Sequence, residues 1–438
     1  MSATRTGWEH ARKGAGLAYL LLAGAAAALP WAGAFAQSEP FLDDAKAGAQ
    51  LRSLYFQRDL PANVTQESAA IGGWLWGRTG YWRDFLQFGG TFYTSLPLAD
   101  PQNKEGAGLL KPGQNGYGVL GEAYARLKYG EQTATFYRQT LGVNPQTAQG
   151  VRSLQTDLNY LGSHDIRMTP YTYEAAMFNG KITDTLRYQA GYVDGVKDQN
   201  SEHFVSMARF AGVNKDAGLW TGGLQWQPRK DLWVQGFYYS VADTLRIAYT
   251  DVDWVNRISK DSYYRFASQY TDQRSDGANL LTGSYFRTWN GAVYGEYGWN
   301  WLTLYASYGA TGNGQQIRTP YSFGPFYISQ RIKNFNRAGE DAAMLGSTFS
   351  LAPLGLNGLS FDMNISADTS HPPNTPTGAF QPKWREYDTD LVYRFSKDFV
   401  MPNTRVRLRW ATVSEDYGTR IDRSNDLRLD LNWAVTFN

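Results

Sequence analysis

Arginines at alternate positions are the clearest candidates for chemistry in this chain of 438 residues. Arg405, Arg407 and Arg409 are separated by the single apolar residues Val406 and Leu408. A guanidinium group offers paired N–H donors that match the two oxygens of a carboxylate, and it stays charged at any physiological pH. Because residues two apart lie on one face of a β-strand, such a run could give a carboxylate several successive, similar contacts.

Basic residues take matching positions in other segments that alternate between apolar and polar residues. We predict that the polar faces of these segments line the interior of the fold. There an arginine either contacts a solute or pairs with an acidic neighbour, which satisfies both charges. The residues assigned to these faces are Arg126, Lys128, Arg187, Arg394, Arg405, Arg407, Arg409 and Arg428, with the acids Glu122, Glu296, Asp362, Asp390 and Asp430.

Signatures of catalysis are weak. Ser163, His164 and Asp165 are consecutive, and consecutive residues do not meet in space as a catalytic triad. The remaining histidines, His203 and His371 after the N-terminal segment, also fall in apparent connections. Residues 116–121 match a dinucleotide-binding glycine motif in spacing, but they lead into a strand rather than a helix.

Metal chemistry is also disfavoured. The chain has no Cys, which excludes zinc-thiolate and iron–sulfur sites as well as a disulfide scaffold. Glu340 and Asp341 could hold a divalent cation, although pairing with Arg337 is the favoured interpretation. We therefore predict a protein that is not an enzyme and that has no cofactor and no metal site.

Composition narrows the class of protein further. The formal net charge is only +2, which argues against a protein that coats nucleic acid. Aromatic residues make up 15% of the chain, and there are 45 glycines. An outer-membrane β-barrel has this kind of composition, because its polar interior masks its apolar outer face in any average.

The first 36 residues have the three parts of a secretory signal. A basic segment, an apolar run over 15–29 and an Ala-x-Ala cleavage pattern at 34–36 follow one another. The alternative is a single membrane anchor, but the apolar run is short and no basic stop-transfer cluster follows it. We predict that residues 1–36 are cleaved and that residues 37–438 form one barrel.

Strict alternation of apolar and polar residues dominates the predicted mature chain. Residues 359–366 alternate without exception, and residues 427–437 do so with one lapse at Ala434. A soluble β-sandwich would bury the apolar face, whereas a membrane barrel would turn it toward lipid. The segments run about 9–12 residues and carry aromatic residues at their ends, which favours tilted membrane strands.

Short and long connections alternate along most of the chain, as they do in outer-membrane barrels. Our count is about 18 antiparallel strands, with Asn279–Gly298 taken as one long bent strand. The short turns are expected at 130–131, 181–184, 228–231, 298–300, 352–357 and 397–403, and the long connections at 98–115, 141–169, 197–216, 311–339, 368–383 and 414–425.

Several segments resemble the OprD-type outer-membrane channels, also called Occ or outer-membrane carboxylate channels. The more specific matches are the Arg-Met-Thr-Pro segment at 167–170 and the late loop-to-strand segment at 335–342. Further similar segments are residues 51–59, 191–207, 405–409 and 426–433. The resemblance covers nearly all of the predicted mature chain.

The resemblance implies an 18-stranded barrel with an inward-folded constriction loop and a ladder of basic residues that passes small carboxylates. It implies that Arg52 and Arg58, which share one strand face, begin this ladder, and that Arg138 and Arg167 flank the constriction. The predicted solute-binding or pore-lining residues are Arg52, Arg58, Arg126, Lys128, Arg138, Arg167, Arg187, Arg337, Arg394, Arg407, Arg409 and Asp390.

We therefore expect a substrate-selective porin for passive uptake of small carboxylates across the outer membrane of a Gram-negative bacterium. A general or sugar-type diffusion porin is the main alternative, and an outer-membrane barrel enzyme is the less favoured one. Expected partners are the solutes, outer-membrane lipid and the barrel-assembly machinery, without nucleic acid. The chain would act as a monomer or a loose homotrimer.

Overall fold

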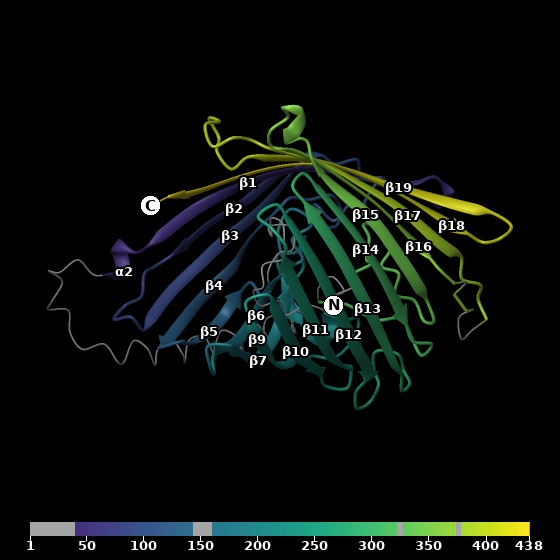
Figure 1. Cartoon of the computed structure of the whole chain (residues 1–438). Coiled ribbons are helices and arrows are strands. Elements are labelled where there is room, and N and C mark those ends of the chain that lie inside the picture. Colours follow the sequence, from purple (N-terminus) through teal and green to yellow (C-terminus); the bar gives the residue numbers. More distant parts are fainter. Residues whose placement is uncertain (1–39, 143–159, 322–326, 371, 374–377, 438) are drawn as a thin grey trace.

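A single antiparallel sheet makes up nearly all of the computed structural model (Figure 1). The structure describes residues 40–142, 160–321, 327–370, 372–373 and 378–437, so the predicted signal segment 1–36 lies outside the described residues. The strands are β1 (Lys46–Leu60), β2 (Val64–Arg78), β3 (Leu86–Ala99), β4 (Tyr117–Tyr129), β5 (Gln132–Gln139), β6 (Thr172–Lys181), β7 (Leu186–Lys197), β8 (Phe204–Ser206), β9 (Leu219–Arg229), β10 (Leu232–Val241), β11 (Leu245–Arg257), β12 (Ser262–Ser275), β13 (Arg287–Trp299), β14 (Leu302–Thr311), β15 (Asp341–Ser350), β16 (Leu359–Asp368), β17 (Lys383–Arg394), β18 (Arg405–Asp416) and β19 (Ile421–Phe437).

The sheet closes on itself because β1 pairs with β19 from Ala47 opposite Phe437 to Asp59 opposite Asn425. Each wall strand also pairs with its neighbour in sequence, except that β7 pairs with β9 along its length. The three-residue β8 pairs only with the last residues of β7. Within the described residues the wall therefore has 18 strands plus one short extra strand, which confirms the predicted barrel and strand count.

Alternation separates the two faces of the wall. On β19, Leu427 and Leu429 are 37% and 47% exposed, whereas Arg428 and Asp430 are 4% and 8% exposed. The apolar side chains thus point outward and the charged ones inward, since successive strand residues face opposite sides. Closure leaves the wall strands without an unpaired sheet edge, which a membrane-embedded sheet requires.

The connections at one rim are short, and the longest ones lie at the other rim. We call these the short-turn rim and the long-loop rim. Two expected segments differ from the structure. Residues 276–286 form a connection rather than part of one bent strand, because Gly277, Asn279 and Gly283 have positive φ values. Residues 417–420 form a tight turn at Gly418, so the long connection expected at 414–425 consists mostly of strand.

Helices are minor. The connection 198–218 contains β8 and the one-turn helix α3 (Met207–Phe210), and α2 (Pro40–Asp43) precedes the first strand. Two short 3₁₀ turns, η1 (Pro61–Asn63) and η2 (Ala352–Leu354), join strands. None of the helices in the described part of the chain has the length and apolar character needed to cross a membrane.

Long loops fold into the barrel and fill part of it. Leu161 and Tyr321 come from the connections 140–171 and 312–340, and they pack against Tyr173, Tyr239 and Ile247 on the inner faces of β6, β10 and β11. All five side chains are at most 1% exposed. This apolar packing occupies the interior beside β6–β11, whereas charged side chains line the interior beside β17–β19 and β1.

The outward orientation of Leu429, in the middle of β19, predicts an asymmetric response to charge. Leu429→Arg should lower the free energy of unfolding by roughly 2–4 kcal/mol, because an arginine near the bilayer midplane is poorly solvated. Leu429→Ile, an apolar control, should change it little. Denaturant unfolding in lipid vesicles measures both, and equal stability of the two variants would mean that this face does not meet lipid.

Candidate functional site

A continuous set of arginines covers the inner faces of four neighbouring strands. We call this set the basic wall; it consists of Arg394 on β17, Arg405, Arg407 and Arg409 on β18, Arg428 on β19, and Arg52 and Arg58 on β1. The register explains the clustering. Arg394 lies opposite Arg405, and Arg409 lies opposite both Asp390 and Arg428. Directly opposed residues share a face of the sheet, so the alternation in each strand builds one basic surface.

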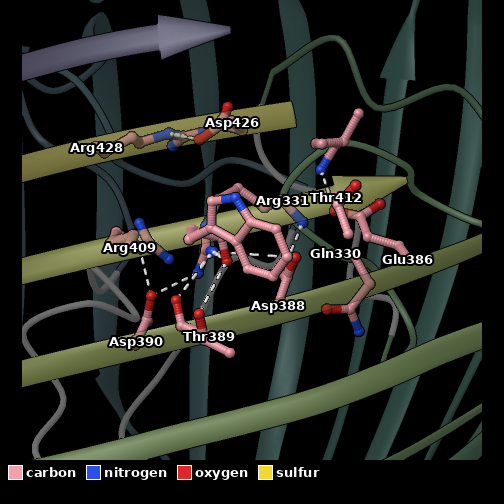
Figure 2. A network of polar contacts seen from close by, with 12 residues as sticks. Gln330, Arg331, Glu386, Asp388, Thr389, Asp390, Arg409, Thr412, Asp426 and Arg428 are labelled. Atoms are coloured by element: carbon pink, nitrogen blue, oxygen red, sulfur yellow. Dashed lines mark hydrogen bonds and ion pairs between the residues drawn. The ribbon is translucent and has the colours of Figure 1, made fainter. Parts of the chain in front are cut away.

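Asp390 connects three of these cations. Its carboxylate accepts hydrogen bonds from Arg407 Nη2, from Arg409 Nε at 3.1 Å and from Arg331 Nη2 at 2.6 Å. Figure 2 shows Arg409 and Arg331 directed toward this carboxylate. The Asp390 carboxylate therefore binds three guanidinium groups, and one of them, Arg331, also lies 3.9 Å from the carboxylate of Asp388.

Arg331 reaches the basic wall from the long connection 312–340. Its Nη1 donates to the carbonyl of Trp410 at 2.9 Å, and the backbone N–H groups of Ile332 and Lys333 donate to Glu386 at 2.7 and 2.8 Å. Burial alone would lower the pKa of Arg331, but the carboxylates of Asp390 and its neighbours outweigh burial and raise it. The loop is thus fastened to the inner wall as a fixed part of the pore lining.

A second cluster surrounds the fully buried ring of Phe56 on β1. The Cζ atoms of Arg167 and Arg428 both lie 4.8 Å from the ring centroid, and that of Arg58 lies 5.4 Å away. Asp426 accepts hydrogen bonds from Arg58 Nη2 at 2.7 Å and from Arg428 Nε at 2.7 Å. Again one carboxylate and one aromatic face hold three cations together.

Arg167 is the least neutralised member of this cluster. Its Nε donates to the carbonyl of Ala107 at 2.8 Å and its Nη1 to that of Ile166 at 3.2 Å. Within the described residues no carboxylate forms an ion pair with it, and the side chain is partly exposed. Burial, and then the neighbouring Arg428 and Arg58, lower the pKa of Arg167 well below its usual range. An anion at this point would remove that repulsion.

Arg52 fixes the loop that carries Arg167. It pairs through both terminal nitrogens with Asp165, and its Nη1 also donates to the backbone carbonyl of Arg167 at 2.6 Å. Both members of the pair are at most 8% exposed. Since Arg52 belongs to β1, this buried pair fixes residues 165–167 relative to the wall. The remainder of this predicted constriction loop, 143–159, lies outside the described residues.

Arg138 lies elsewhere than expected. Cross-strand register puts it opposite Ala123 and Glu174, on the face that carries Phe136 and the 45% exposed Phe178, which is the outer face of the wall. It pairs there with Glu174 at 3.0 Å. The expectation that it lines the constriction is not met, because β5 continues to Gln139 and its alternation directs Arg138 outward.

The remaining predicted residues fall into two groups. Arg337 is buried and bonded to Glu340 at 2.6 Å and Asp368 at 2.7 Å, with its Cζ 3.4 Å from the Trp384 ring. The favoured pairing of Arg337 with Glu340 is therefore present.

The second group of predicted residues lines the interior near the short-turn rim. Arg126 donates a hydrogen bond to Thr135, and Lys128 pairs with Asp84. Arg187 and Arg394 have no ion pair within the described residues.

An aromatic recess adjoins the basic wall. It has a volume of about 300 Å³ and lies between the inner faces of β2–β4 and the loop residues 140–142 and 163–170. Trp74, Trp76, Tyr93 and Tyr124 line it, and the guanidinium of Arg52 lies 4.9 Å from the Trp74 ring centroid. The recess therefore combines ring faces with one basic residue, Arg78, and with the carboxylates of Glu122 and Asp165.

The consecutive Ser163, His164 and Asp165 have structural contacts instead of triad geometry. Asp165 pairs with Arg52, and the His164 ring lies 4.7 Å from the ring of Tyr171. Burial, followed by the charge of Arg167, lowers the pKa of His164 to about 3, so the imidazole is neutral at physiological pH. A histidine that stays neutral adds no charge to the pore lining.

Comparisons with known proteins agree with this architecture. The model of the family described as "outer membrane porin, OprD family" matches residues 39–437. No curated protein matches the chain by sequence. Similar solved structures include Pseudomonas aeruginosa OpdK with vanillate (20% identity, TM-score 0.76, 91% of this chain and 100% of that one).

Two further structures have the same barrel. Pseudomonas aeruginosa OccK9 (OpdG) is 20% identical with a TM-score of 0.78, over 91% of this chain and 100% of that one. Acinetobacter baumannii OccAB1 is 15% identical with a TM-score of 0.78, over 92% and 99%. The family model covers almost the whole chain, and these proteins are channels and not enzymes. The chain therefore belongs to the OprD family of outer membrane porins.

Proposed function

We propose that this porin is a passive, substrate-selective channel for small carboxylate-bearing solutes. The observation that carries the proposal is the guanidinium of Arg167, which extends from an inward-folded loop and donates hydrogen bonds only to backbone carbonyls among the described residues. Because no carboxylate of the described residues forms an ion pair with it, its charge is available to a solute carboxylate. The Arg428 and Arg58 beside it repel it, and an arriving anion relieves that repulsion.

The basic wall continues this attraction along the pore. From Arg167 a solute meets Arg428, Arg409, Arg407 and finally Arg394, the last near the short-turn rim. Asp390 and Asp426 neutralise part of this charge, so each position binds weakly. Weak successive sites suit a channel, since a solute that binds tightly at one site leaves slowly.

The aromatic recess supports a preference among carboxylates. Trp74, Trp76 and Tyr124 offer ring faces beside Arg78, which also lines the recess, an arrangement that fits a planar ring carrying a carboxylate. The printed title of one similar structure names vanillate, an aromatic carboxylate, with OpdK. We therefore propose aromatic carboxylates as the preferred class; a sugar-type porin would instead leave the arginines without effect on selectivity.

The first prediction concerns Arg167. Arg167→Gln keeps a donor for the backbone carbonyls but removes the charge. It should weaken carboxylate binding by roughly ten- to hundredfold, which corresponds to about 1.5–3 kcal/mol for a hydrogen bond to a charged group. Reversal potentials and carboxylate block in single-channel recordings measure this, and high salt should reproduce part of the loss by screening.

Arg138→Gln is the matched control, because it removes the same charge from the outer face. It should leave anion preference and carboxylate block unchanged. Wild-type anion preference in the Arg167 variant would contradict a role for this residue in selectivity. Equal losses in both variants would indicate a general effect of net charge.

The recess yields a separate prediction. Trp76→Ala should reduce block by benzoate about threefold to tenfold, since an aromatic contact contributes about 0.5–1.5 kcal/mol. Block by acetate should not change. Leu75→Ala, one residue away on the outer face, is the control. If benzoate and acetate respond alike to Trp76→Ala, the recess does not select for rings.

Orientation is testable on cells. We propose that the short-turn rim, where β1 begins and β19 ends, faces the periplasm, as in other barrels of even strand number. A peptide tag inserted after Gly283, in the connection 276–286, should be labelled on intact cells. A tag after Gly130 should be labelled only after permeabilisation. Surface labelling at both positions would contradict this orientation.

A further inference from the structure

Three arginines form a row across the outer face of the wall. Arg246 on β11 lies directly opposite Arg274 on β12, and Arg274 lies directly opposite Arg287 on β13. Their side chains are 46%, 45% and 62% exposed. Like charges that face each other across neighbouring strands destabilise a sheet unless an anion lies among them. We call these residues the outer arginine row.

The row has a defined height on the barrel. It lies at the long-loop rim, since β11 and β13 begin there and β12 ends there. Tyr270 and Trp289 are exposed on the same face, with ring centroids 6.3 Å apart and nearly parallel planes. Such aromatic side chains mark the boundary between the hydrocarbon region and the lipid headgroups. The outer arginine row is therefore at headgroup level, beyond that boundary.

Acidic neighbours neutralise the row only in part. Arg246 pairs with Asp276, and Arg287 pairs with Asp272 at 2.7 Å. Arg274, in the middle, reaches Asp272 only at 3.8 Å. Two carboxylates thus accompany three guanidinium groups, and the central one is the least compensated. An anion with several oxygens could contact Arg274 together with either neighbour.

A groove adjoins the row. Its volume is about 310 Å³, and it is lined by Tyr270, Trp289, Asp272 and Arg287 on the wall and by Asn313 in the connection 312–340. It combines ring faces with polar side chains that can bond hydroxyl groups. Its place beside Arg287 leaves room for a saccharide next to a bound phosphate.

We propose that the outer arginine row and this groove bind the phosphorylated saccharide headgroup of an outer-leaflet glycolipid. The phosphate would lie over Arg274 and one neighbouring arginine, and the sugar would occupy the groove against Trp289. Guanidinium groups suit this partner, because they form paired hydrogen bonds with phosphate oxygens. The inference uses the proposed orientation of the long-loop rim toward the outer leaflet, but it does not depend on which solute the pore passes.

Native mass spectrometry of the purified barrel with diphosphoryl lipid A tests the proposal, with phosphatidylglycerol as a second anionic lipid. Wild-type protein should retain lipid A in preference to phosphatidylglycerol. Arg274→Gln should lower the apparent affinity for lipid A about tenfold or more, and Arg274→Lys, which keeps the charge but loses paired bonding, should lie between. Arg257→Gln, at the opposite end of β11, should behave as wild type.

Folding and pore function are followed separately. Heat-modifiable migration in gels reports an intact barrel, and Arg287→Gln replaces the Arg274 variant if that variant does not fold. Conductance in bilayers without lipid A should be unchanged in a folded variant. Equal lipid A affinity in the Arg274 and Arg257 variants would overturn the proposal. Parallel losses of lipid A and phosphatidylglycerol would also overturn it, since they would indicate general attraction of anions.

Discussion

Pairing of the first and last strands is the constraint on which the rest of this structure depends. Once β1 and β19 are joined, the sheet has no edge, and every residue of the wall faces either outward or inward. The two-residue period then assigns each side chain to one of two very different surroundings. Leu429 and Arg428 are neighbours in sequence, yet the first is exposed outward and the second is buried among charges.

Closure of an 18-stranded wall also leaves an interior too wide for wall side chains to fill. Loops from the long-loop rim must enter it, and they need fixed contacts there. Arg52 supplies one through Asp165, and Arg331 supplies another through Asp390. The main role of Arg52 and Arg331 in the fold is therefore to hold these loops against the wall. Arg167 differs from these two arginines, because within the described residues no carboxylate forms an ion pair with it.

The wall was predictable from sequence because alternation is a local property. The faces of β18 and β19, and the inward position of Arg407 and Arg428, follow from it directly. Alternation of apolar and polar residues no longer identifies a strand where the strand extends beyond the membrane. Around residues 414–425 polar residues occupy both faces, so an extended hairpin has the composition of a loop. Arg138 was expected at the constriction because of the resemblance and its place beside a long connection, although its strand parity directs it outward.

Loop residues escaped prediction for a different reason. Arg331 has no periodic pattern around it, and its partners Asp390 and Trp410 are remote in sequence, so only the folded chain brings them together. Arg167 was expected at the constriction from the resemblance, but its contact with Phe56 also depends on the folded chain. Strand parity predicts which wall residues face the pore. Which loop residues line it depends on the ion pairs and hydrogen bonds that they form with the wall.

The register that builds the basic wall inside also builds the outer arginine row. Inside, Arg409 lies opposite Arg428, and Asp390 and Asp426 lie within hydrogen-bonding distance of them. Outside, Arg274 lies between two arginines with a carboxylate no nearer than 3.8 Å. Opposed like charges cost free energy in both places. Carboxylates of the fold compensate most of these charges. For the least compensated arginines, Arg167 inside and Arg274 outside, we have proposed a mobile anion: a solute in the pore and a lipid phosphate at the membrane surface.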